Sequence, residues 1–182
     1  MANKNMKHTE NSYTSAHGVL LESQGFGVLV LGPSGIGKSE SAIELITKGF
    51  KLVSDDVVEV LRSDSGQLIG KAPQNIKHLI EVRGLGIINV RDIYGINTVL
   101  DECEIDMVIE LARWDSDNDY DRLGIENTSY NLLGMDLPYK IIPVSLNRNI
   151  PMIIEVAVRS QIIELSDGGT EGVKTKNFNR GS

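Results

Sequence analysis

Hydrophobic residues fall into short runs that are separated by polar or glycine-containing stretches, which is the pattern of strands joined by tight turns. The runs predict strands at residues 17–23, 26–31, 50–54, 57–61, 67–70, 87–90, 105–111 and 140–144. Gln24-Gly25 predicts a tight turn, so the first two strands should form a hairpin. Ser63-Asp-Ser-Gly66 predicts a second turn, with residues 67–70 as the returning strand.

Three stretches have helical character. Residues 39–48 carry apolar side chains at 42, 43, 45 and 46 and end before Gly49, which predicts an amphipathic helix with a glycine stop. Residues 72–80 predict a short helix with Pro73 in its first turn, and residues 149–165 predict a longer one opened by Pro151. Alternating strands and helices predict an α/β fold in which helices flank a mixed sheet.

The most informative stretch lies between the strand at 26–31 and the helix at 39–48. It reads Gly32, Pro33, Ser34, Gly35, Ile36, Gly37, Lys38, Ser39 and fits the phosphate-loop pattern. A strand, a glycine-rich loop and a helix direct backbone N–H groups and a helix N-terminus at a phosphate. Lys38 has the length to reach β and γ phosphates, and the Ser39 hydroxyl can ligate Mg²⁺.

Other polar residues occupy ends of predicted strands. Asp55-Asp56 follows the strand at 50–54. The two residues either take part in metal and water chemistry beside the phosphate loop or are solvated aspartates of a turn. Residues 81–86, Glu-Val-Arg-Gly-Leu-Gly, are either a mobile active-site loop or a helix C-cap with its glycine. His17 lies at the mouth of the first hairpin, where a lone histidine is usually a surface residue.

Composition and charge limit the classes of protein to which the sequence can belong. The length of 182 residues indicates one domain, and the net charge of −7 argues against nucleic acid as a partner. Cys103 is the single cysteine, so no internal disulfide exists and a cytoplasmic location is expected. No apolar run approaches the ~20 residues of a membrane span.

The two ends are polar and lack hydrophobic periodicity. We expect residues 1–15 to be a disordered lead or cloning remnant, residues 16–166 to be the catalytic domain and residues 167–182 to be a flexible tail. Asp121-Arg-Leu-Gly124 resembles a GTPase switch, but no Asn-Lys-x-Asp motif accompanies it, so a GTPase is excluded.

Taken together, the motifs resemble one family, the HPr serine kinase/phosphorylase, in its C-terminal catalytic domain. The resemblance covers about residues 16–158 and rests on the following stretches: His17-Gly-Val-Leu, Gly32 to Glu40, Val53-Ser-Asp-Asp, Glu81-Val-Arg-Gly-Leu-Gly-Ile-Ile-Asn-Val90, Tyr120-Asp-Arg-Leu-Gly124, Ile142-Pro-Val, Arg148-Asn149 and Ile154-Glu-Val156. The phosphate loop alone is unspecific, whereas these motifs in this order are highly specific.

The resemblance implies a nucleotide-binding core like that of phosphoenolpyruvate carboxykinase. It implies transfer of a phosphoryl group from ATP to a serine of HPr, the phosphocarrier of the sugar phosphotransferase system. It also implies the attack of phosphate on phosphoserine to give pyrophosphate, a requirement for Mg²⁺ and a homo-hexamer.

The resemblance also implies roles for single residues. Asp55 is the base that takes the serine proton and returns it in phosphorolysis, and the adjacent Asp56 is coupled to it. Lys38 neutralises the β and γ oxygens, and Ser39 and Glu81 are the magnesium ligands. His17 is an active-site residue and Arg122 is a catalytic cation. Residues 80–89 serve both reactions and residues 143–148 serve dephosphorylation.

The sequence departs from the family pattern in three places. Full-length members carry a separate N-terminal domain, so we expect a truncated or a naturally short form. Asn147 replaces a glycine and is expected to tolerate the positive φ of that place. Val158-Arg-Ser-Gln161 replaces the usual Met-Asn-Phe, which weakens the expectation of substrate docking across subunits. The alternatives are a small-molecule kinase and a nucleotide-binding regulatory module without transfer activity.

Overall fold

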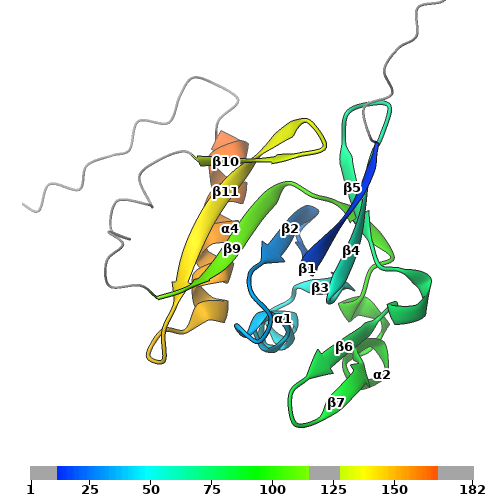
Figure 1. The fold of residues 1–182 in the computed structure, drawn as a ribbon, viewed down its shortest axis with the longest axis vertical. Helices are drawn as coiled ribbons and strands as arrows, with labels where there is room; N and C mark the ends of the chain where they lie inside the picture. The colour runs from blue at the N-terminus through cyan, green and yellow to red at the C-terminus, as the bar shows by residue number, and fades with distance from the viewer. Residues whose placement is uncertain (1–11, 115–127, 168–182) are drawn as a thin grey trace, which may run out of the picture.

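The computed structural model describes residues 12–114 and 128–167. The strands of its main sheet are β1 Tyr13–Ser23, β2 Phe26–Leu31, β3 Lys51–Ser54, β4 Val57–Arg62, β5 Leu68–Lys71, β8 Glu102–Glu104, β9 Met107–Arg113, β10 Thr128–Leu132 and β11 Met135–Val144. They follow the order β10-β11-β9-β2-β1-β4-β5-β8, and β3 also pairs with β1 (Figure 1). The pairs β2–β9 and β9–β11 are parallel and the other pairs are antiparallel, which confirms the predicted mixed sheet.

The helices and the remaining strands are shorter or lie outside this sheet. The helical segments are α1 Lys38–Thr47, α2 Val90–Tyr94, α4 Ile150–Asp167 and the 3-10 turns η1 Gln74–Ile76 and η2 Ile96–Thr98. Strands β6 Leu79–Val82 and β7 Gly86–Asn89 form a separate two-stranded hairpin. Among the helices of the described residues, none is both long enough and apolar enough to cross a lipid bilayer.

Two hydrophobic cores explain why β2 is apolar at every position. Val28 and Val30 belong to the core beneath α1 and α4, whereas Leu29 belongs to the core on the opposite face of the sheet. Side chains of a strand alternate between faces, so a strand covered on both sides needs an unbroken apolar run. The short apolar strand therefore sits at the centre of the sheet, where it holds the loop that follows it.

Strand β1 pairs with β3 and β4 along the same edge. His17 is opposite Val57 in β4, and Leu20 is opposite Ser54 in β3. Between these pairs the chain is interrupted at Asp55-Asp56, where the Gly18 N–H donates to the carbonyl of Asp56 over 3.0 Å. The sheet thus places the two aspartates beside β1, which is the neighbour of β2, the strand that leads into the phosphate loop.

The structure corrects the predicted helix at 72–80. Only η1 is helical there, and His78 has a φ of +65°, which a helix cannot accommodate. Ile80 pairs with Ile88 in the β6–β7 hairpin and is 1% exposed, so strand pairing and burial outweigh the local helical pattern. The alternative of a helix C-cap at residues 81–86 is wrong for the same reason.

The N-terminal boundary of the ordered chain also differs from the prediction. Tyr13 to Ser15 belong to β1 and pair with Leu61 to Glu59 of β4, so these residues of the expected lead are in a strand. At the other end, α4 continues to Asp167. The Asp121-Arg-Leu-Gly124 motif lies outside the described residues.

Candidate active site

The loop between β2 and α1 provides a cradle of backbone. Gly32, Gly35 and Gly37 have φ values of +144°, +74° and +102°, which L side chains rarely adopt. A Cβ atom at Gly32 would lie 2.6 Å from the carbonyl oxygen of Leu111, so the loop is held tightly against β9. Gly37 precedes α1 without a side-chain cap, which leaves the first N–H groups of the helix for a ligand.

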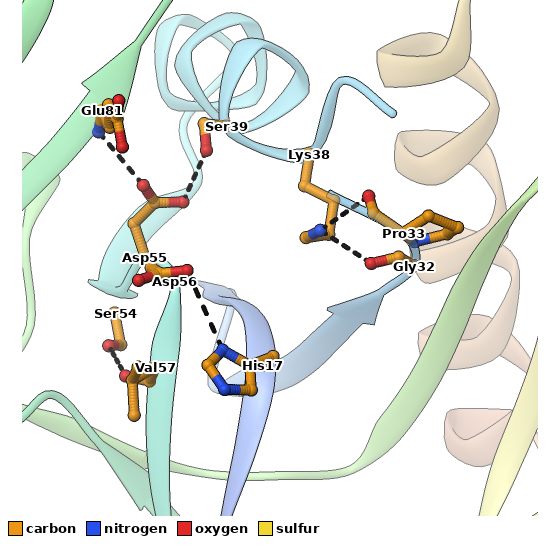
Figure 2. A network of polar contacts seen from close by, with 10 residues as sticks. All are labelled: His17, Gly32, Pro33, Lys38, Ser39, Ser54, Asp55, Asp56, Val57 and Glu81. Carbon is orange, nitrogen blue, oxygen red and sulfur yellow. Dashed lines mark hydrogen bonds and ion pairs between the residues drawn. The ribbon is translucent and has the colours of Figure 1, made fainter. Parts of the chain in front are cut away.

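Lys38 spans this cradle. Its Nζ donates to the carbonyl oxygens of Gly32 over 2.8 Å and Pro33 over 3.1 Å (Figure 2). These are neutral acceptors on the same loop, and they fix the ammonium group beside the place where phosphate oxygens would lie. The arrangement suits a cation that neutralises phosphate charge.

Asp55 is the buried centre of the site. Its side chain accepts from the Ser39 hydroxyl at Oδ1 over 2.8 Å and from the Glu81 N–H at Oδ2 over 3.1 Å (Figure 2). The residue is 4% exposed, and burial raises the pKa of its carboxyl group while the two hydrogen bonds oppose the rise. Asp55 thus connects the phosphate loop to the β6–β7 hairpin.

Asp56 and His17 lie on the solvent-exposed side of the same site. Asp56 Oδ1 is 3.9 Å from His17 Nδ1, and both side chains are at least 80% exposed. Asp56 has a φ of +71°, which is an uncommon conformation for a residue other than glycine. The Ser54 hydroxyl donates to the carbonyl of Val57 over 2.5 Å and braces the turn.

The structure brings most of the predicted site residues to one cavity of about 600 Å³. Its walls come from β1, the phosphate loop, α1, the β3–β4 junction and the β6–β7 hairpin, and they include these predicted residues: His17, Gly32, Ser34, Gly35, Gly37, Lys38, Ser39, Asp55 and Glu81. Ile36 packs instead against the core, and Pro33 contributes its carbonyl to Lys38. Arg122 lies outside the described residues.

Arg83 is a cavity residue to which sequence reasoning gave no role of its own. A Cβ atom at Gly35 would lie 2.7 Å from Arg83 Nη2, so the guanidinium group rests on the phosphate loop. The sequence has an acid and an arginine at the start of a glycine-containing segment. This pattern indicated a candidate active-site loop but gave no separate role to the arginine. The hairpin therefore brings a second cation to the loop.

The segment at 143–148 does not line this cavity. It covers the end of β11 and the connection to α4, and residues 146–148 line a second cavity of about 520 Å³. Asn147 is not among the described residues with positive φ, so its tolerance of that conformation is not needed in this structure. Asparagine is accommodated here without the strain that the family glycine suggested.

The donor set suits magnesium together with phosphates. Ser39 can donate its hydroxyl hydrogen to Asp55 and still offer an oxygen lone pair, and Glu81 lines the same cavity. Across residues 12–114 and 128–167 there is no group of three or more His, Cys, Asp or Glu that could hold a metal by itself. Mg²⁺ usually takes one or two protein oxygens and completes its shell with water and substrate phosphates, which fits this site.

Comparisons with known proteins agree with this geometry. The sequence matches the family model described as HPr Serine kinase C-terminal domain over residues 9–176. It is 46% identical over 151 residues to the HPr kinase/phosphorylase of Geobacter sulfurreducens, which covers 83% of this chain and 47% of that protein. It is 49% identical over 144 residues to the enzyme of the same name from Geobacillus thermodenitrificans, which covers 79% of this chain and 47% of that protein.

A solved structure gives the same result for the fold. The Hpr(Ser) kinase/phosphatase from Coxiella burnetii superposes with a TM-score of 0.74 at 30% identity, covering 84% of this chain and 93% of that chain. The chain spans about half the length of the curated relatives that it matches. By sequence and by fold, the chain belongs to the family of the HPr serine kinase C-terminal domain.

Proposed function

We propose that the chain transfers the γ-phosphoryl group of ATP to a serine hydroxyl of HPr and also removes it by phosphorolysis. The observation that carries this proposal is the meeting of Lys38, Ser39, Asp55 and Glu81 at one cavity, although three separate segments supply them. Phosphoryl transfer requires positioning and charge neutralisation more than covalent chemistry, and these groups supply both. The names of the relatives supply the acceptor, HPr, and the second activity.

In this proposal the loop and Lys38 hold the β and γ phosphates of ATP. Ser39 and the Glu81 carboxylate would hold Mg²⁺, which would supply positive charge near the transferred group. Asp55 orients Ser39, because the Ser39 hydroxyl hydrogen is directed at Asp55 Oδ1 and a lone pair of the hydroxyl oxygen stays available. Arg122 is the further cation, and removing it should lower the rate by ~10²–10³.

The structure gives the two aspartates different environments in one cavity. Asp55 is 4% exposed but lines the cavity, and each of its oxygens accepts one hydrogen bond and keeps a further lone pair. Asp56 is exposed at the cavity wall and has His17 beside it. We propose that Asp55 takes the serine proton, as the family resemblance implies, while it also positions Ser39, and that the adjacent Asp56 is coupled to it.

The reverse reaction uses the same groups. A phosphate oxygen attacks the phosphorus of phosphoserine, the bond from phosphorus to the serine oxygen breaks, and pyrophosphate forms. The protonated aspartic acid returns its proton to the departing serine oxygen, as microscopic reversibility requires. Phosphate and pyrophosphate would occupy the cradle that holds the β and γ phosphates of ATP in the forward direction.

The setting of the reaction is also a proposal. We place it in the cytoplasm, assign a homo-hexameric assembly and retain the likeness of the core to phosphoenolpyruvate carboxykinase. The family resemblance supports all three, and the single cysteine, Cys103, suits a reducing compartment.

Incubation with labelled ATP, Mg²⁺ and HPr, followed by excess phosphate, tests the proposal. We expect label on HPr that phosphate then removes as pyrophosphate. Label on a metabolite without HPr would favour a small-molecule kinase, and ATP binding without any transfer would favour a regulatory module. Either of these results would contradict the proposed function.

Paired substitutions test the assignment of the two aspartates. Asp55→Asn should reduce kcat by ~10²–10⁴ in both directions while Mg-ATP binding persists. Asp56→Asn should reduce kcat less, because it leaves Asp55 and its hydrogen bonds to Ser39 and Glu81 in place. The reverse pattern would give the role of base to Asp56.

A further inference from the structure

The second cavity adjoins the first across the phosphate loop. It lies between the first two turns of α1 and residues 146–151, which connect β11 to α4. Gly37 and Glu40 line both cavities, so the two form a continuous surface around the N-terminus of α1. Figure 1 shows α1 between the β6–β7 hairpin on one side and the β11–α4 connection on the other.

The chemistry of the first cavity fixes the direction of a bound nucleotide. Ser39, Asp55 and Glu81 gather on the side of β2 where β1 and β3 lie, so the reacting phosphoryl end belongs there. Strands β9 and β11 lie on the other side of β2 and run parallel to it, so their carboxyl ends flank the loop opposite Asp55. Ligands of such sheets bind outside the carboxyl ends of parallel strands.

We propose that the second cavity binds the ribose and the base of the ATP whose phosphates occupy the first. This inference rests on the proposed use of ATP and assigns the part of the nucleotide that the phosphate loop does not hold. Its volume of about 520 Å³ is within the usual range for a small-molecule site. The γ-phosphate end of ATP points toward Asp55, so the nucleoside end extends past Glu40 into the second cavity.

The walls offer suitable partners for a nucleoside. Glu44 supplies a carboxylate from α1, and a carboxylate is the usual acceptor for ribose hydroxyls. Asn147 supplies an exposed amide that can both donate to and accept from the edge of a base. Leu146 is fully exposed beside these polar groups, and the flat face of a base would cover it.

The wall formed by residues 146–151 is held in place by its own contacts. Asn149 accepts from the Met152 N–H over 3.0 Å at the start of α4, so this side chain is used as a helix cap. Arg148 donates to the carbonyl of Pro143 over 3.0 Å, and its guanidinium lies 5.9 Å from the ring centroid of Trp114. These contacts preorganise the wall before a ligand arrives.

Calorimetry with two ligands separates the nucleoside from the phosphates. Mg-ATP and Mg-tripolyphosphate should be titrated into the wild type, Glu44→Gln and Leu146→Ser. We expect Glu44→Gln to weaken ATP binding by about 5–20-fold and Leu146→Ser by about 3–10-fold, with tripolyphosphate affinity unchanged within about twofold. Glu164→Gln and Ile163→Ser are matched controls on exposed α4 positions outside both cavities, and they should change neither affinity.

Each of the other results of this experiment would contradict a specific part of the inference or of the proposed function. If both variants leave the preference for ATP over tripolyphosphate unchanged, the nucleoside does not use this cavity, and the proposed function still stands. The same holds if the wild type binds ATP no more tightly than tripolyphosphate. If the wild type binds neither ligand, both the inference and the proposed use of ATP are overturned.

Discussion

Asp55 and Asp56 are adjacent in the chain and lie in opposite environments. Asp55 is buried with both oxygens hydrogen-bonded, whereas the Asp56 side chain is 80% exposed and faces His17. The positive φ of Asp56 lies where the pairing of the chain with β1 is interrupted between β3 and β4. Two identical side chains at one cavity thereby differ in their hydrogen bonding and in their access to solvent.

Replacing Gly35 by alanine tests the contact between the phosphate loop and the hairpin. The new methyl group would meet Arg83 at 2.7 Å in a backbone conformation of positive φ. We expect a loss of ~1 kcal/mol in unfolding free energy from the backbone strain, together with a drop of about tenfold or more in Mg-ATP affinity. Urea unfolding and calorimetry measure the two effects.

Gly66→Ala is the matched control for that substitution. Gly66 has a φ of +86° and open space where a Cβ would lie, so it shares the strain without the neighbour. It should lower the unfolding free energy by a similar amount and leave ATP affinity intact. Equal ATP affinities in the two variants would show that the Arg83 contact does not shape the phosphate site.

Cys103 permits a prediction about pH. Burial, followed by the nearby carboxylates, raises the pKa of its thiol from 9.0 to about 12. The reactive thiolate is therefore ~10³ times scarcer at pH 8.5 in the folded chain than in the unfolded chain. Iodoacetamide should label the native protein far more slowly than the denatured protein, and rapid native labelling at pH 8.5 would contradict the burial of this thiol.

The same shift determines how stability depends on pH. Between pH 9 and about 12 the folded state binds the thiol proton more tightly than the unfolded state does. This contribution to stability is complete below pH 9 and is lost as the pH rises through that window. Urea midpoints should therefore fall over this range in the wild type and fall less steeply in Cys103→Ser.

At the scale of elements, the site depends on how α4 and the hairpin dock. Helix α4 packs beside α1, where the Nζ atom of Lys48, the residue that follows α1, lies 3.3 Å from Glu155 Oε2. The hairpin is tied to the site by the bond from the Glu81 N–H to Asp55 and by the burial of Ile80. Both elements approach α1 from different sides, and each of them lines one of the two cavities.

Substitutions on two faces of α4 should separate packing from exposure. Ile154 is 0% exposed in the core beneath α1 and α4, so Ile154→Ala should lower the unfolding free energy by ~2–4 kcal/mol through lost contacts and a cavity. Met152 is 48% exposed two residues earlier, and Met152→Ala should cost less than ~1 kcal/mol. Similar losses in urea unfolding would mean that α4 is not docked as described.

At the scale of the whole molecule, ligand binding should stabilise the fold. Mg-ATP at about 100 times its Kd should add about 2.7 kcal/mol to the unfolding free energy, a rise of about 5–10 °C in Tm. Lys38→Met should abolish this rise, because Lys38 is held at the phosphate cradle. Lys71→Met, which removes a lysine of β5 outside both cavities, should preserve it.

Much of this molecule follows from local sequence. The phosphate loop could be read in advance because its glycines, lysine and serine act through backbone geometry and short spacing, and its flanking strand and helix have clear periods. The mixed sheet was predictable for the same reason, since β2 and β9 are compact apolar runs. The family could be identified because its motifs keep a fixed order along the chain.

Only the tertiary structure decided the rest. The pairing of Ile80 with Ile88 outweighed the helical pattern at 72–80. The different environments of Asp55 and Asp56 arose because the two residues lie between β3 and β4, where the pairing with β1 is interrupted. Contacts such as Arg83 against Gly35 join segments nearly fifty residues apart, and no local propensity encodes them. The sequence by itself determined the phosphate loop and the positions of most strands along the chain, because these depend on neighbours in the chain. Packing between distant segments determined the order of strands in the sheet, which carboxylate is buried and where a second cavity opens.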